Sequence, residues 1–124
     1  MRVYKNSWFV RFARKEKIDD DTLRDAITRA QRGLIDADLG GGLIKQRIAR
    51  VGEGKSGGYR SIIIYKSGSK AFFVFGFAKR MRENLTGPEL LAYKQLAAIL
   101  LPLTDTELDR QIEDEFLVEM FENE

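Results

Sequence analysis

The spacing of the apolar residues changes twice along this chain, and this change restricts the fold more than any other feature. Apolar residues recur at helical spacing through residues 8–30, alternate or form short runs through residues 43–78, and return to helical spacing after residue 86. A period of about 3.6 residues marks one face of a helix, whereas alternation marks a strand. The sequence therefore predicts an α+β fold, with helices at both ends of the chain and a sheet between them.

The N-terminal part predicts a short strand followed by two helices. Residues 2–4 suit a strand, Ser7 is a candidate N-cap for a first helix, and the aspartates at residues 19–21 are N-cap candidates for a second. Gly33 fits the C-terminal stop of that second helix. We expect an N-terminal helical hairpin packed on a small, mostly antiparallel twisted sheet.

Three segments predict the strands of that sheet. Residues 43–51 alternate, residues 59–65 are rich in β-branched and aromatic residues, and residues 71–78 are apolar on both faces. We expect the last segment at the centre of the sheet, joined to the one before it by a tight turn at residues 67–69. Tyr59, Tyr65 and the phenylalanines of residues 72–77 are expected in the core.

The C-terminal part predicts two further helices. Thr86 and Thr104 each precede a glutamate by three residues, which is the capping-box pattern. Leu108, Ile112 and Phe116 are expected to pack the second helix onto the rest of the protein. We expect a single domain over residues 1–124, with a core of roughly residues 1–100 and an acidic helical extension over residues 104–124.

The composition excludes several kinds of chemistry, because the chain has no cysteine and no histidine. Disulfides, thiolate catalysis and cysteine-ligated metals are excluded, and the commonest general base and metal ligand is missing. We expect no metal and no cofactor. The longest apolar run, residues 71–78, is too short to span a bilayer. We therefore expect a soluble, cytoplasmic protein that has no membrane partner.

The net charge of +2 conceals a strong asymmetry. Residues 1–104 hold 20 of the 21 Lys and Arg and 10 of the 19 Asp and Glu, whereas residues 105–124 hold nine acids and one base. Within residues 43–82 there are ten Lys and Arg and a single acid, Glu53. Such a concentration of positive charge favours a polyanionic partner, with nucleic acid first among the candidates.

Residues 52–58, Gly-Glu-Gly-Lys-Ser-Gly-Gly, invite comparison with a nucleotide-binding P-loop. That signature requires a glycine five residues before the glycine of Gly-Lys-Ser, and the residue there is Ala49. A P-loop also leads into a helix, whereas residues 59–65 predict a strand. We expect no nucleotide cofactor and interpret these residues as a flexible hairpin tip that carries Lys55.

The basic residues of the strands are expected to meet at one end and one face of the sheet. In a three-stranded antiparallel meander, the start of the second strand lies beside the ends of the first and third. A phosphate-binding site requires such a group of cations without neutralising acids. The residues expected there are Lys45, Arg47, Arg50, Lys55, Arg60, Lys79, Arg80 and Arg82.

Three short motifs carry a resemblance to a known family. They are Ile-Lys-Gln-Arg at residues 44–47, Gly-Gly-Tyr-Arg at residues 57–60 and Phe-Ala-Lys-Arg at residues 77–80. In this order, the sequence resembles the RelE/ParE superfamily of bacterial type II toxins, and is most similar to its RelE-like, HigB-like branch. The resemblance covers roughly residues 1–100. It implies an mRNA interferase, an endoribonuclease that cuts message at the ribosome and is restrained by a cognate antitoxin.

The resemblance also implies roles for individual residues. Arg60 matches the arginine near the scissile phosphate, Arg80 matches a second catalytic arginine, and Lys45 and Arg47 match a basic pair on the preceding strand. The candidate catalytic residues are therefore Arg60, Arg80, Lys45 and Lys55, and the candidate RNA-binding residues are Arg47, Arg50, Lys79 and Arg82.

The proton acceptor is the point at which the chain departs from the family pattern. RelE-like enzymes commonly place a tyrosine or histidine soon after the second arginine, but Thr86 lies near that place, and the next tyrosine, Tyr93, lies within a predicted helix. A lysine that cationic neighbours keep partly uncharged is the alternative. Lys45 and Lys55 are the candidates, with Lys79 third.

Two other functions are compatible with the same residues. One is ParE-like inhibition of DNA gyrase without nuclease activity, and the other is a nucleic-acid-binding module without catalysis. The acidic residues 105–124 also allow two interpretations. They can fold back and shield the basic face, or they can form an amphipathic helix whose acids lie in solvent.

Overall fold

The computed structural model describes residues 1–50 and 54–121, and leaves the side chains of residues 50 and 54–56 undescribed. The described part is an α+β fold with four helices and one six-stranded sheet. In chain order the elements are β1 (Arg2–Asn6), α1 (Ser7–Glu16), α2 (Asp20–Gln31), β2 (Ala37–Gly40), β3 (Leu43–Arg50), β4 (Gly54–Lys66), β5 (Lys70–Ala78), α3 (Gly87–Leu100), α4 (Asp105–Glu113) and β6 (Leu117–Met120). No helix of the described residues is long and apolar enough to cross a membrane.

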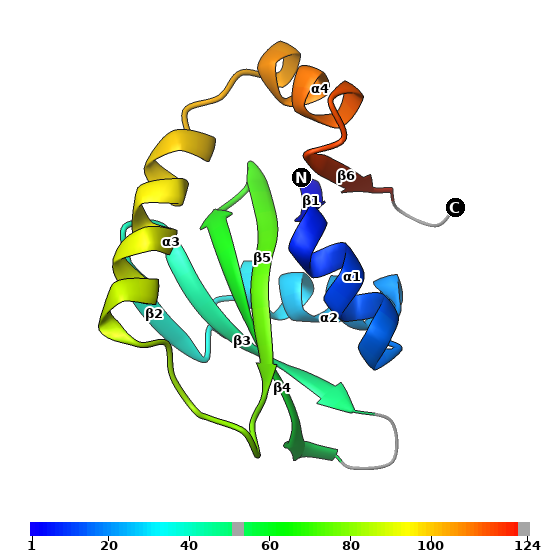
Figure 1. Ribbon diagram of the computed structural model, residues 1–124, viewed down its shortest axis with the longest axis vertical. Coiled ribbons are helices and arrows are strands. Elements are labelled where there is room, and N and C mark those ends of the chain that lie inside the picture. The colour runs from blue at the N-terminus through cyan, green and yellow to red at the C-terminus, as the bar shows by residue number, and fades with distance from the viewer. Residues whose placement is uncertain (51–53, 122–124) are drawn as a thin grey trace.

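The sheet has the strand order β2-β3-β4-β5-β1-β6 (Figure 1). Strands β3 to β5 form the expected antiparallel meander, and β2 adds to it in antiparallel orientation beside β3. The first strand then lies beside the fifth in parallel, with Val3 opposite Ala71, and the last strand adds to β1 in antiparallel orientation. Strand β5 is therefore central, as its apolar composition predicted.

Each face of the sheet carries its own apolar core. Helices α1 and α2 cover one face, where Phe9, Leu23 and Ile63 belong to one buried cluster. Helices α3 and α4 belong to the other face, where Ile62 and Leu108 belong to a second cluster. The expected helical hairpin is not confirmed, because α1 contacts β5 and β1 whereas α2 contacts β3.

The local signals at helix ends are mostly confirmed. Asp19 caps α2 by accepting the N–H of Thr22, and both Thr86 and Thr104 form complete capping boxes with the glutamate three residues on. The exception is α1, whose N-cap is Asn6 rather than Ser7. The Asn6 side chain accepts the N–H of Phe9 at 2.8 Å.

Three parts of the sheet differ from the prediction. Strands β2 and β6 were not expected, and each is only four residues long with no regular alternation in the sequence. Residues 54–58 belong to β4 rather than to a hairpin tip, and residues 52–53 of that tip lie outside the described part. Arg60 therefore lies within β4 instead of at its start.

The C-terminal extension is helical only in part. Helix α4 ends at Glu113, and Glu115 follows with a φ of 65°, which turns the chain into β6. Leu108 is buried as expected, but Phe116 lies beyond the helix and its side chain is 62% exposed. The expected packing role of Phe116 is therefore wrong, because the chain leaves helical geometry before reaching it.

Replacing Ile63 by alanine tests the first core cluster. Ile63 is fully buried between the sheet and the N-terminal helices, so Ile63→Ala is expected to lower the free energy of unfolding by about 2–5 kcal/mol. Leu91→Ala is the matched control, because Leu91 is 60% exposed on α3, and should change it by less than about 0.5 kcal/mol. Urea unfolding of both variants measures the difference, and equal effects would contradict the assigned core.

Candidate functional site

Two arginines face each other across the middle of the sheet. Arg47 of β3 is the cross-strand partner of Arg60 of β4, and Arg60 is in turn the partner of Phe77 on β5. Directly opposed residues point to the same side of a sheet, and Phe77 belongs to the cluster on the α3 face. Lys45, two residues before Arg47, points the same way. The predicted convergence of Lys45, Arg47 and Arg60 is thus found on the α3 face.

The guanidinium of Arg60 is left with an unsatisfied donor. Its Nη1 is buried and has no hydrogen-bond partner among the described residues, and no ion pair of the described part involves Arg60. Like charges opposed across a sheet are unfavourable, and a buried donor without an acceptor costs about 1–3 kcal/mol. An anion bound beside Arg60 would remove both penalties, so the arrangement is suited to a negatively charged ligand.

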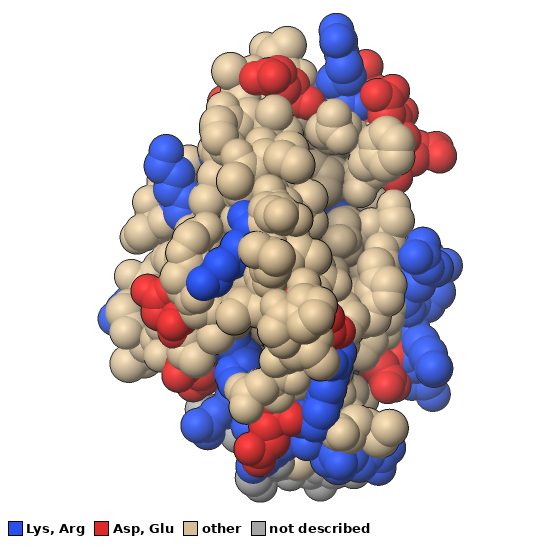
Figure 2. Space-filling view, turned by 60° about the vertical axis from the view of Figure 1, so that its left-hand side comes forward, with Lys and Arg blue, Asp and Glu red and all other residues tan. Residues whose placement is uncertain are grey.

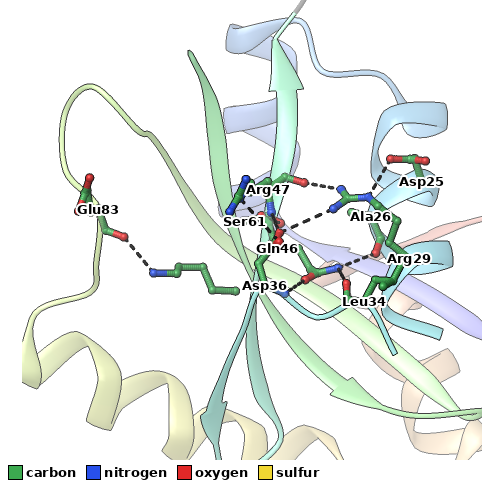
Figure 3. A network of polar contacts seen from close by, with 10 residues as sticks. Asp25, Ala26, Arg29, Leu34, Asp36, Gln46, Arg47, Ser61 and Glu83 are labelled. Atoms are coloured by element: carbon green, nitrogen blue, oxygen red, sulfur yellow. Dashed lines mark hydrogen bonds and ion pairs between the residues drawn. The ribbon is translucent and has the colours of Figure 1, made fainter. Parts of the chain in front are cut away.

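The outer edge of β3 is held by a polar network that sequence reasoning missed (Figure 3). Asp36 accepts the backbone N–H of Arg47 at 2.7 Å, and Arg29 donates to the Arg47 carbonyl at 2.6 Å. These side chains satisfy the backbone of β3 beyond its pairing with β2. Arg47 is consequently held at a defined position, while its own side chain stays about half exposed and 3.7 Å from Asp36.

Gln46 anchors the same network from inside the protein. Its side chain is fully buried, accepts the N–H of Asp36 at 2.7 Å and donates to the carbonyls of Ala26 and Leu34 at 3.0 and 3.2 Å. In the sequence Gln46 appears as one polar residue in an alternating strand. Only its burial beneath α2 reveals that it ties the loop before β2 to the sheet.

The segment after β5 is fastened over the α3 face by two basic residues. Lys45 donates to the carbonyl of Glu83 at 3.2 Å and to Asn84 Oδ1 at 2.7 Å. Arg82 binds both carboxylate oxygens of Glu89, at 2.7 and 3.0 Å, and its guanidinium lies 4.9 Å from the Phe77 ring centre. Arg82, which was expected to bind RNA, is therefore already occupied by an acid.

The remaining basic candidates lie close to this face or outside the described part. The N–H of Lys79 donates to the carbonyl of Gly58 at 3.0 Å, which brings the end of β5 beside β4. Arg80 follows in an exposed turn. The side chains of Arg50 and Lys55 lie outside the described residues, so their predicted places in the site are not described.

Thr86 and Tyr93, which lie near the place of the family's tyrosine or histidine, both make structural contacts. The hydroxyl of Thr86 caps α3 by accepting the N–H of Glu89 at 3.3 Å. Tyr93 stacks on Phe75 with 5.4 Å between ring centres. Burial, reinforced by the charge of Glu89, raises the pKa of Tyr93 above its usual value, so its hydroxyl stays protonated at neutral pH.

The acidic extension pairs with the other end of the sheet. Arg2 forms ion pairs with Asp105 at 3.3 Å, Asp109 at 2.7 Å and Glu119 at 2.8 Å. Figure 1 shows α4 and β6 at one end of the molecule and the segment after β5 at the opposite end. The shielding hypothesis is thus wrong for residues 105–121, and the amphipathic-helix interpretation holds for α4.

The surface shows a partial separation of charge (Figure 2). Lys and Arg predominate along the lower end and the right-hand side of the view, with some acidic residues among them, while acidic residues also gather at the upper end beside a basic side chain. No group of three or more acidic, His or Cys residues among those described is arranged to hold a metal ion. The site is therefore built from cations on a sheet face, with Asp36 and Glu89 paired to Arg47 and Arg82 beside it.

Comparison with known families matches the chain, over residues 1–120, to the RelE toxin of the RelE/RelB toxin–antitoxin system. The chain belongs to the RelE toxin family. The match includes α4 and β6, so the RelE resemblance extends beyond the roughly 100 residues expected from the motifs. Membership implies an antitoxin as partner. A search of curated proteins gave no match.

Glu89 gives the site a testable pH dependence. The hydrogen bonds from Arg82, and then those from Thr86, lower the pKa of Glu89 from 4.5 to about 2. A carboxylate with a lowered pKa in the folded state stabilises it above the unfolded pKa and loses this contribution as the pH falls. Glu89→Gln should therefore lower the thermal midpoint at pH 7, and the difference from the unchanged protein should shrink between pH 5 and about pH 2.

Glu83→Gln is the matched control for that measurement. The carboxylate of Glu83 has no partner among the described residues, although its backbone carbonyl accepts from Lys45. Its thermal midpoint should follow that of the unchanged protein at every pH. A Glu89→Gln difference that persists at pH 2 would contradict the assigned ion pair.

Proposed function

We propose that this RelE-family protein is the toxin of a type II toxin–antitoxin system and acts as an mRNA endoribonuclease that inhibits translation. The observation that carries the proposal is Arg60, whose buried Nη1 lacks an acceptor beside the like charge of Arg47. A scissile phosphate supplies the missing acceptors and the missing negative charge. Arginine suits this role because its planar fork binds a phosphate by two hydrogen bonds.

The reaction is an attack by a ribose 2′-hydroxyl on the adjacent phosphorus. A bond forms between O2′ and phosphorus, the bond from phosphorus to O5′ breaks, and the products carry a 2′,3′-cyclic phosphate and a 5′-hydroxyl. Arg60 and Arg80 hold the phosphate and stabilise the charge that accumulates on its oxygens. Arg47, Arg50 and Lys79 bind neighbouring phosphates, whereas Arg82 supports the site through Glu89 and Phe77.

The reaction also needs a group that takes the proton of the 2′-hydroxyl and a group that protonates O5′. Lys45 and Lys55 are the candidates for the first role. Lys45 lies on the same face as Arg47 and is held in place by Glu83 and Asn84. The second role can be filled by the same lysine after it has accepted the proton.

The proposal includes the setting in which the protein works. It acts as a single domain in the cytoplasm, on mRNA at the ribosome, and needs neither a metal nor a nucleotide cofactor. A cognate antitoxin binds and neutralises it. The chemistry above uses groups of this chain alone, which is consistent with a metal-independent reaction.

Arg60→Ala tests the proposal directly. Message cleavage on purified ribosomes should fall by about 10²–10³-fold, which is the usual loss when one charge-stabilising donor is removed. The free energy of unfolding should not fall, because the substitution removes an unsatisfied buried donor and a like-charge contact. Arg60→Lys should recover only part of the activity, since an ammonium cannot replace the bidentate guanidinium.

Lys66→Ala is the matched control, because Lys66 is exposed on the same strand at the opposite end. It should cleave message normally. Lys70, at the start of β5, is not suitable as a control, since its side chain donates a hydrogen bond to the carbonyl of Leu103 at 2.7 Å. Full cleavage by Arg60→Ala would overturn the assignment. Growth inhibition that persists without message cleavage, together with inhibition of DNA gyrase, would favour the ParE-like alternative.

A further inference from the structure

An irregularity in β5 brings an aromatic side chain to the boundary between the two faces of the sheet. The register between β4 and β5 shifts after Ile62, so that Val74 is an extra residue opposite no partner. Such a bulge bends its strand and redirects the next side chain, which here is Phe75. Pairing with β1 stops just before, and the Asn6 side chain donates to the Val74 carbonyl at 3.1 Å.

Phe75 joins a series of aromatic rings that runs from α1 to the candidate site. Its ring centre lies 4.6 Å from that of Trp8 and 6.1 Å from that of Phe77, and Trp8 stacks on Phe12 at 5.1 Å. Phe77 is the cross-strand partner of Arg60. The series therefore connects the surface of α1 with the arginine to which we assign the scissile phosphate.

Helix α1 is seated closely enough on the sheet to fix these rings. A methyl group added at Gly76 would lie only 2.7 Å from Phe12 Cε2. The absence of a side chain there lets Phe12 approach the backbone of β5. Trp8 and Phe12 themselves are only partly buried, so they form an aromatic surface that is still accessible to solvent.

Two cations flank this aromatic surface. A surface hollow is lined by Trp8, Arg11, Phe12 and Lys15, and Arg11 and Lys15 lie one helical turn apart with exposed side chains. Among the described residues no carboxylate pairs with either of them. The arginines of α2 differ in this respect, because Arg24 and Arg29 each bind an aspartate of their own helix.

Aromatic rings flanked by unpaired cations are what single-stranded nucleic acid requires. Bases of any sequence stack on the rings, while lysine and arginine follow the phosphates. A double helix would not bind to this aromatic surface by stacking, because its bases are already stacked on one another. An acidic protein could satisfy Arg11 and Lys15, but it would offer no planar group to the part of the Trp8 ring that Phe12 and Phe75 leave accessible.

We propose that Trp8, Arg11, Phe12 and Lys15 form a second RNA-binding surface, which binds the single-stranded RNA flanking the phosphate held by Arg60. One base stacks on Trp8, and Arg11 and Lys15 bind the adjoining phosphates. This inference rests on the proposed function, since it assigns the flanking part of the same substrate. It extends the RNA path from the α3 face around β5 to α1.

Trp8 is the only tryptophan of the chain, so its fluorescence reports directly on this surface. The full-length Arg60→Ala protein is titrated with a single-stranded oligoribonucleotide of about 12 nucleotides, and binding is followed in parallel by the anisotropy of labelled RNA. We expect Trp8 fluorescence to be quenched with the same midpoint as the anisotropy change. Quenching should not occur with a blunt RNA duplex.

Two double variants test whether RNA binding depends on Arg11 and Lys15 in particular or on the general positive charge of α1. Arg11→Gln with Lys15→Gln should weaken RNA binding by about 10-fold and lower the salt dependence by roughly 1.4 in log–log slope, for two lost phosphate contacts. Arg14→Gln with Lys17→Gln changes two other exposed cations at α1 and should have a much smaller effect. All four positions are exposed, so circular dichroism should show an unchanged fold.

The outcomes separate this inference from the proposed function. RNA binding without quenching of Trp8, or equal losses in the two double variants, would overturn the second surface even if message cleavage is confirmed. A double variant at residues 11 and 15 that loses antitoxin binding but retains RNA binding would also overturn it. Quenching by RNA without any message cleavage would support the surface and contradict the proposed nuclease.

Discussion

The burial of β5 on both faces is the constraint on which the rest of the structure depends. Four consecutive residues of this strand, 71–74, are fully buried, and their side chains point alternately to opposite faces. Burying one such large apolar side chain contributes about 1.5–3 kcal/mol. Neither face can therefore be left open along this stretch. The N-terminal helices cover one face, the C-terminal helices belong to the other, and β1 and β4 complete the pairing of the strand.

The candidate site lies on the α3 face of β3 and β4, beside the segment that follows β5. Arg47 and Arg60 lie opposite each other on the α3 face, in an arrangement that opposes folding. The neighbouring structure holds them there through contacts that do not neutralise Arg60. Asp36, Arg29 and Gln46 secure the backbone of β3, and Lys45 and Arg82 secure the segment after β5. An unfavourable local feature held by well-satisfied surroundings is a common property of functional sites.

Several features of the fold could be predicted because they depend on neighbouring residues. The capping boxes at Thr86 and Thr104, the cap at Asp19 and the alternation along β3 are local, and each is present in the structure. Strand β6 could not be predicted, because its four residues are a strand only through pairing with β1, more than 110 residues earlier. The parallel pairing of β1 with β5 has the same origin. The bulge at Val74 is likewise set by the partner strand, so the position of Phe75 between Trp8 and Phe77 has no signal in the sequence.

The sequence by itself determined the secondary-structure class, the basic character of residues 43–82 and the absence of histidine and cysteine chemistry, because these depend on composition and on short-range spacing. Only the tertiary structure decided which cations are available. Arg82 is held by Glu89 and Arg2 by three acids, whereas the buried Nη1 of Arg60 has no acceptor among the described residues. The physical reason is that ion pairing depends on distances of a few ångströms between residues far apart in the chain. A count of charges along the sequence cannot supply those distances.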